Sequence, residues 1–165
     1  MLQIDKSLIF DANILIDFYR ISKEIFKFLY DLSVIMKVSD VTFLKVEQIN
    51  ESELENLHIE IIESPAKMLF ESANRIKSSL AFDDYVSFLH AKENNFILST
   101  NDKTLKTYAQ SQNVDSLWGL EIILFIEINN KISKEKAIKL FEKLKKVNNR
   151  ITDDIEKEFL KILFE

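Results

Sequence analysis

The sequence contains no cysteine, and this absence removes several kinds of chemistry at once. Without cysteine the chain has no disulfide, no thiolate nucleophile and no cysteine-based zinc site. Histidine occurs only at His58 and His90, so a histidine-rich metal centre is not expected, and we interpret both as structural or surface residues. A metal here would have to be held mainly by carboxylates, whose oxygen atoms suit hard cations such as Mg²⁺ or Mn²⁺.

Glycine and long hydrophobic runs are also scarce. Gly119 is the single glycine, whereas dinucleotide-binding and P-loop motifs need several glycines for close approach of the backbone to phosphate. Those two classes are therefore excluded. No apolar run approaches the ~20 residues that span a bilayer, and no cationic leader precedes an apolar core. The sequence predicts a cytoplasmic protein with no membrane partner.

The composition is that of a folded chain of ordinary size. Of 165 residues, 47% are hydrophobic and 30% are charged, which fits one domain with a sizeable core. The net charge of −5 argues against broad coating of nucleic acid by a basic face. It does not exclude a nuclease, because a bound divalent cation reverses the local charge where a phosphate must sit.

Short apolar runs alternate with segments of helical periodicity over the first two thirds of the chain. This alternation predicts an α/β fold with a parallel sheet covered on both faces. From Leu117 onward the pattern indicates helix alone. We therefore expect an α/β domain over residues 1–115 and C-terminal helices over 116–165 that pack on the same domain. The predicted strands are 8–10, 34–38, 59–62 and 96–98.

Four acids occupy comparable places in this pattern. Asp11 follows the first strand and Asp102 follows the strand at 96–98, while Asp84 opens a helix and Glu47 lies within another predicted helix. The carboxyl ends of parallel strands are where ligands bind in open α/β sheets. Asp11 could also be no more than a helix N-cap, a role that Asp favours.

Clustered carboxylates have a clear chemical use. Like charges brought together raise one another's pKa, and a divalent cation resolves that conflict. Such a cation can activate water and polarise a phosphoryl group, so phosphodiester cleavage is the natural reaction. Thr100 and Asn13 are the expected uncharged helpers, able to orient a carboxylate or a water molecule by hydrogen bonding.

Three ordered segments carry a family resemblance: DANILID, then VSDVTFLKVEQI, then LAFDDYVSFLHAKENNFILSTNDKTL. Together they resemble the PIN-domain family, whose members include the VapC-type toxins of toxin–antitoxin pairs. The resemblance covers roughly Ile4 to Val114 and extends more weakly from Trp118 to Arg150. It implies a three-layer α/β/α sandwich with a central parallel sheet, and an endoribonuclease that depends on Mg²⁺ or Mn²⁺.

The resemblance also implies residue roles and partners. The family's four acids fall on Asp11, Glu47, Asp84 and Asp102, and these would hold the cation, with Glu47 acting directly or through water. Asp83 competes for the third place, but the spacing to the later alanine favours Asp84. Thr100 and Asn13 match the supporting hydroxyl and polar positions. The implied partners are an RNA substrate, an antitoxin protein and a second copy of the chain in a homodimer.

Two other readings remain open from the sequence. The same fold could be a binding module without catalysis, which would bind RNA or a protein partner through its helical tail. A phospho-acceptor receiver domain also has acids at strand ends, but it needs a paired acid and a late lysine that are not laid out here. Lys103, Lys106 and Arg20 are candidate phosphate contacts, although lysines on a surface are usually only solvated.

Overall fold

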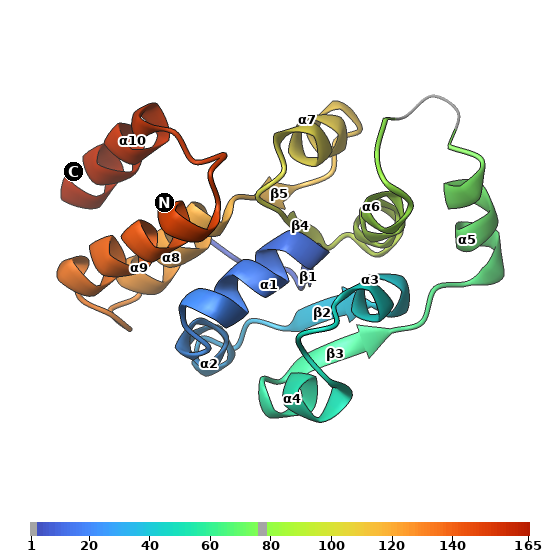
Figure 1. Cartoon of the computed structure of the whole chain (residues 1–165), viewed down its shortest axis with the longest axis horizontal. Helices are drawn as coiled ribbons and strands as arrows, with labels where there is room; N and C mark the ends of the chain where they lie inside the picture. The colour runs from blue at the N-terminus through green and yellow to red at the C-terminus, as the bar shows by residue number, and fades with distance from the viewer. Residues whose placement is uncertain (1–2, 76–78) are drawn as a thin grey trace.

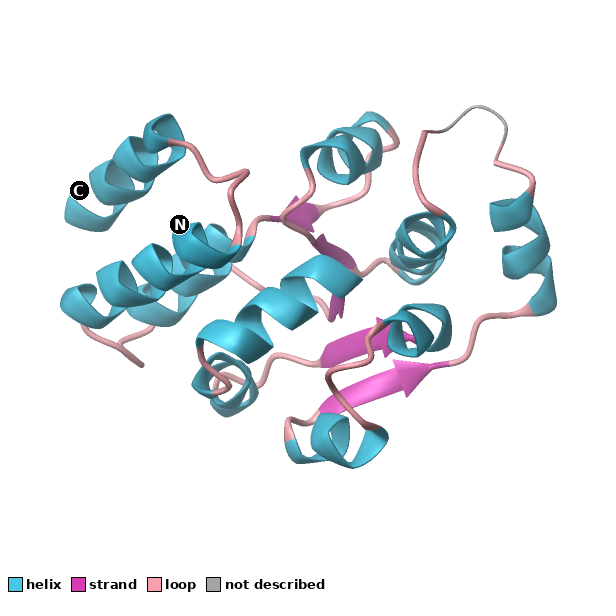
Figure 2. Ribbon diagram, in the orientation of Figure 1, coloured by secondary structure: helices cyan, strands magenta, loops and turns pink. Residues whose placement is uncertain are grey.

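Five short parallel strands form the centre of the protein (Figure 1). The computed structural model describes residues 3–75 and 79–165. Helices cover both faces of the sheet, so the fold is the expected three-layer α/β/α sandwich (Figure 2). The strands lie in the order β3-β2-β1-β4-β5, and they are β1 (Leu8–Phe10), β2 (Met36–Ser39), β3 (Ile59–Ile62), β4 (Ile97–Ser99) and β5 (Ser116–Leu117).

Helices separate the strands of the sheet. Among the described residues they are α1 (Ala12–Ile21), α2 (Glu24–Asp31), α3 (Asp40–Lys45), α4 (Glu51–Asn56), α5 (Ala66–Ala73), α6 (Phe82–Asn94), α7 (Lys103–Ser111), α8 (Gly119–Ile128), α9 (Lys134–Val147) and α10 (Asp153–Phe164). The single helix expected after β2 is replaced by two short ones, α3 and α4. Helices α8, α9 and α10 lie together at one end of the sandwich, and α5 lies at the other (Figure 1).

The two faces of the sheet carry separate hydrophobic cores. Successive strand residues point to opposite faces, so Leu8 and Phe10 enter one core while Ile9 enters the other. The first core is completed mainly by α1, α2, α8, α9 and α10, and the second by α5, α6 and α7. Because all of these strand residues are fully buried, the strands read as continuous apolar runs, as expected for a doubly covered parallel sheet.

The C-terminal helices belong to the first core. Phe141 of α9 and Phe159 of α10 stack with ring centroids 4.3 Å apart, and both are buried with the side chains of β1. The expectation of helix alone from Leu117 was wrong at its first residue, because Ser116 and Leu117 form β5 beside β4. A strand of two residues is too short to show periodicity. No helix in the described ranges is long and apolar enough to cross a membrane.

Candidate functional site

The strand order places a switch point between β1 and β4. The chain runs outward from β1 to β2 and β3 on one side, and then continues through β4 to β5 on the other. In sheets of this kind the crevice beyond the carboxyl ends of the two central strands is the usual ligand site. Asp11 follows β1 directly, and Thr100, Asn101 and Asp102 follow β4. Of the sequence-predicted residues, Asp11, Thr100 and Asp102 therefore meet at this crevice.

Asp11 is buried at the centre of the crevice, with an exposed fraction of 1%. Its Oδ1 accepts a hydrogen bond from the Ile14 N–H at 2.8 Å, and its Oδ2 accepts one from the Thr100 hydroxyl. Asp11 is thus the N-cap of α1, the alternative role considered from the sequence, and also a member of the acidic group. Burial raises the pKa of Asp11 to about 7, the two hydrogen bonds oppose the rise, and the charges of Asp84 and Asp102 add to it.

Thr100 connects the first acid to the last. Its Oγ1 donates to Asp11 and accepts from the Asp102 N–H at 2.9 Å. Thr100 is fully buried. Its hydroxyl is fixed by two partners, one that follows β1 and one that follows β4. The structure thus shows the hydrogen bond from Thr100 to a carboxylate that the sequence analysis expected.

Asp102 caps α7 and is also paired with a distant arginine. Its Oδ1 accepts from the N–H groups of Thr104 and Leu105 at 2.7 and 3.1 Å, and its Oδ2 accepts from Arg150 Nη1 at 2.6 Å. Partial burial acts to raise the pKa of Asp102, but these hydrogen bonds and the Arg150 charge outweigh it, so the pKa is lowered. Asp102 is therefore ionised at neutral pH.

Asp84 lies at the start of α6 beside Asp83, and the two differ in their partners. Asp83 is buried and accepts two hydrogen bonds from Lys45 Nζ, at 3.0 and 3.1 Å. The Asp84 carboxylate has no hydrogen-bond partner among the described residues. Burial raises the pKa of Asp84 to about 6, with a further contribution from Asp83, whereas Lys45 lowers it. The charge of Asp84 also acts on Asp11, and Asp83 is not among the main charges that do so.

Glu47 does not join this group, and its predicted place within a helix was wrong. Helix α3 ends at Lys45 because Val46 takes an extended conformation and buries its side chain. Glu47 lies in the following turn and is exposed. It is not among the main charges that act on Asp11, Asp84 or Asp102. Lys45 lies near the acids instead: the hydrogen bond to Asp83 raises its pKa, partial burial opposes the rise, and the charges of Asp83, Asp84 and Asp11 contribute.

A polar pocket of about 290 Å³ adjoins the acids. Asn13, the other predicted helper, lines this pocket together with Arg20 and Arg150, and makes no hydrogen bond to Asp11. Asn101 also lines it. Its amide donates to Asp17 at 3.1 Å and accepts from the Gly119 N–H at 3.0 Å.

Of the candidate phosphate contacts, Arg20 and Lys103 are accessible, whereas Lys106 is not. Lys106 is buried and donates to Glu121 Oε2 and to the Ser116 carbonyl, both at 3.0 Å. Its ammonium group is thus used inside the fold. Arg20 is exposed beside the polar pocket, and Lys103 lines a second, more apolar pocket.

Sequence reasoning missed Lys45 and Arg150, the two cations among the acids. A lysine two residues before a candidate acid gives no signal of which of them will face the crevice. Arg150 lies in the segment between α9 and α10, and its ion pair with Asp102 joins residues 48 apart in the chain.

The carboxylates are not arranged as a closed metal cage. Within residues 3–75 and 79–165, no three His, Asp or Glu side chains are grouped so that they could hold a metal ion. The donors nevertheless suit Mg²⁺ or Mn²⁺, because carboxylate oxygens are their preferred ligands. Mg²⁺ commonly binds through one or two carboxylates and keeps several waters, with substrate phosphate completing its coordination. In this respect the residues fit a divalent cation.

Comparisons with known proteins give no further guidance. No protein-family model matches the chain, and no curated protein matches it.

Proposed function

We propose that the protein is a divalent-metal-dependent endoribonuclease with its site at the β1–β4 switch point. The observation that carries the proposal is the convergence of three carboxylates from three separate elements: Asp11 after β1, Asp84 in α6 and Asp102 after β4. Each of these charges acts on at least one of the other two. The resemblance of the same residues to the PIN-domain pattern supports the choice of RNA as substrate.

The unusual protonation of the site supports a need for positive charge. Asp11 and Asp84 have pKa values raised to about 7 and about 6, so near neutral pH Asp11 is only partly ionised and Asp84 still holds a small share of its proton. A bound cation would favour the ionised forms. Asp84, Asp11 and Asp102 would hold it partly through water molecules, because no three carboxylates of the described residues are grouped closely enough to hold it by themselves. When bound, it would supply water activation and charge neutralisation at the phosphodiester.

The surrounding residues would position the RNA backbone. Arg20 and Arg150 both line the polar pocket beside the acids. A guanidinium group recognises phosphate through two parallel hydrogen bonds. The overall charge of −5 disfavours non-specific binding of RNA to the rest of the surface. Binding would therefore be confined to this site.

The direct test is cleavage of a mixed RNA pool with Mn²⁺, with EDTA, and by Asp11→Asn and Asp5→Asn variants. We expect cutting with Mn²⁺ by the native protein and by Asp5→Asn, in which an exposed acid is changed. Cutting should be lost in EDTA and in Asp11→Asn. Retained activity in Asp11→Asn would refute the site.

The second candidate is a module of the same fold that binds RNA or a protein partner without cutting. It is favoured by the ion pairs that already occupy part of the acidic group, Arg150 with Asp102 and Lys45 with Asp83. Absence of cutting by the native protein, together with retained RNA binding, would support this candidate.

The proposal includes a cytoplasmic location, a homodimer and a separate antitoxin protein, all expected from the sequence. Large exposed apolar side chains provide surface for such partners, among them Leu44 on α3 and Phe70 on α5, which are 81% and 72% exposed. Light scattering at micromolar concentration tests the homodimer, and a monomer would contradict it.

A further inference from the structure

A second pocket, of about 390 Å³, opens beside the proposed site. Its volume lies within the range of small-ligand pockets. Asn101 and Arg150 line both this pocket and the polar one, and Arg150 is the residue paired with Asp102. The two pockets therefore share part of their lining, next to Asp102.

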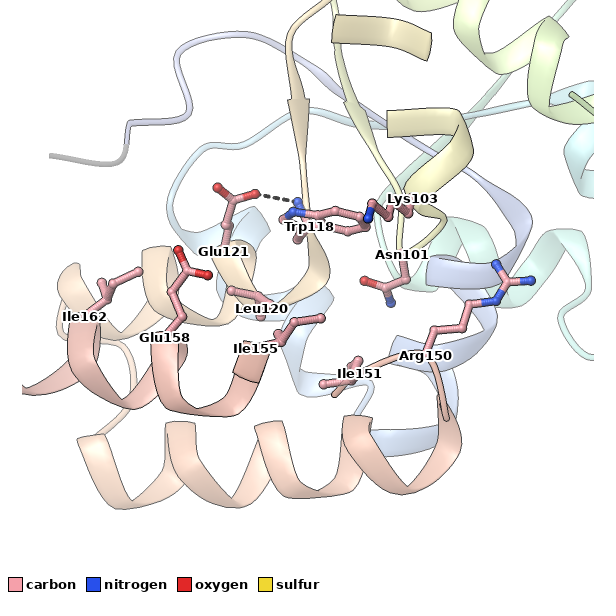
Figure 3. A pocket seen from close by; sticks show the side chains of 10 residues that line it. All are labelled: Asn101, Lys103, Trp118, Leu120, Glu121, Arg150, Ile151, Ile155, Glu158 and Ile162. Carbon is pink, nitrogen blue, oxygen red and sulfur yellow. Dashed lines mark hydrogen bonds between the residues drawn. The ribbon is translucent and has the colours of Figure 1, made fainter. Parts of the chain in front are cut away.

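The pocket has an aromatic wall opposite an aliphatic one (Figure 3). Trp118, at the start of α8, forms one side, and Ile151, Ile155 and Ile162 come from the segment around α10 on the other. Lys106 Nζ lies 4.8 Å from the Trp118 ring centroid but does not line the pocket. A slot between an indole and aliphatic side chains suits a flat, aromatic group.

The charges around the slot indicate which part of a nucleotide enters it. Glu158 lines the pocket, and its carboxylate disfavours a phosphate inside it, whereas the Glu121 carboxylate is paired with Lys106. Lys103 and Arg150 also line it and can hold phosphates that stay outside. The neutral base is thus the part that fits, and stacking of bases on aromatic side chains is the common means by which proteins bind unpaired RNA.

We propose that this pocket binds an unpaired base of the RNA substrate, stacked on Trp118, beside the acidic site. This inference rests on the proposed ribonuclease function and adds to it a preference for single-stranded RNA. A duplex cannot place a base in the slot without breaking a base pair.

Binding at this pocket can be followed by intrinsic fluorescence, because Trp118 is the only tryptophan in the chain. The experiment is a fluorescence titration with a short single-stranded RNA in EDTA, so that binding is measured without metal. We expect saturable quenching of Trp118 by the single strand, and at least tenfold weaker quenching by the same sequence annealed to its complement. Equal quenching by the two forms would overturn the inference.

A matched pair of variants locates the binding. Ile162→Asp places a negative charge in the pocket, and Ile35→Asp makes the same change just before β2, outside the residues that line the pocket. Both side chains are already exposed, at 45% and 57%, so neither change should unfold the protein. We expect about tenfold weaker binding for Ile162→Asp, the loss of one stacked base, and native affinity for Ile35→Asp. Equal affinity of both variants would refute the pocket.

The two proposals fail separately. RNA cleavage without quenching of Trp118 would leave the ribonuclease in place and refute the base pocket. Quenching that is weakened by Ile162→Asp, without any cleavage, would support the pocket and point to the non-catalytic module.

Discussion

Replacing Asp11 by Asn is expected to stabilise the protein, and to do so more strongly as the pH rises. Asparagine has the same shape and is as good an N-cap, so its amide oxygen can accept from the Ile14 N–H. Its amide N–H can donate to the Thr100 hydroxyl, which then reverses its role. The change therefore removes a buried ionisable group while it keeps the local hydrogen bonds.

The sign and size follow from the raised pKa of Asp11. The ordinary value is 3.8 and the folded value is about 7, so the folded protein binds this proton more tightly than the unfolded chain does. The free energy of unfolding therefore falls as the pH rises between these two values, and above them this group causes no further change with pH. The gap corresponds to about 4 kcal/mol near pH 8 and about 2 kcal/mol near pH 5.

The assay is urea denaturation followed by far-ultraviolet circular dichroism, at several pH values, for the native protein, Asp11→Asn and Asp5→Asn. The advantage of Asp11→Asn over the native protein should grow by about 2–3 kcal/mol from pH 5 to pH 8. Asp5 is exposed, so Asp5→Asn should track the native protein. If Asp11→Asn is less stable than the native protein near pH 8, or if its advantage does not change with pH, the reasoning is refuted.

Two further substitutions probe the neighbours of Asp11. Thr100→Val removes the hydroxyl that donates to Asp11 and lowers the pKa of Asp11. That pKa should therefore rise above about 7 in a carbon-13 NMR titration, whereas Thr100→Ser should keep the native value. An unchanged pKa in Thr100→Val would count against the hydrogen bond. Lys45→Met leaves the buried Asp83 without its ion-pair partner and removes a charge that lowers the pKa of Asp84. We expect the free energy of unfolding in urea to fall by about 1–2 kcal/mol and the pKa of Asp84 to rise. Lys45→Arg should largely restore both values. Native values in Lys45→Met would show that the ion pair is unimportant.

The fold could be predicted from the sequence because its strands are buried on both faces. Such strands appear as uninterrupted apolar runs, and their alternation with helical segments leaves a parallel sheet as the simple solution. The strand at Ile59–Ile62 was predicted with the bounds that the structure shows. Strand β5 was missed, since two residues, Ser116 and Leu117, carry no periodic signal.

The candidate site was predictable where a residue directly follows a strand. Asp11 and Asp102 needed only the strand ends, because parallel strands deliver them to the same edge of the sheet. To place Glu47, the end of α3 had to be predicted, and the apolar pattern predicted a helix that continues beyond Lys45. Leu44, which that pattern would bury, is 81% exposed, and Val46 is buried only because the helix has already ended.

Arg150 could not have been found from sequence. Its place depends on how the chain returns from α9 to the switch point, where Asn148 donates to Asp17 at 3.2 Å and Arg150 reaches Asp102. These are tertiary contacts between segments far apart in the chain, and local patterns do not encode them.

The most direct test of the central claim is Mn²⁺ binding, measured by electron paramagnetic resonance of the free ion near pH 8. The account predicts saturable binding by the native protein that is strongly weakened in Asp84→Asn and in Asp11→Asn, and is unaffected in Asp5→Asn. Equal binding by all four proteins, or no binding by the native protein at millimolar Mn²⁺, would contradict it.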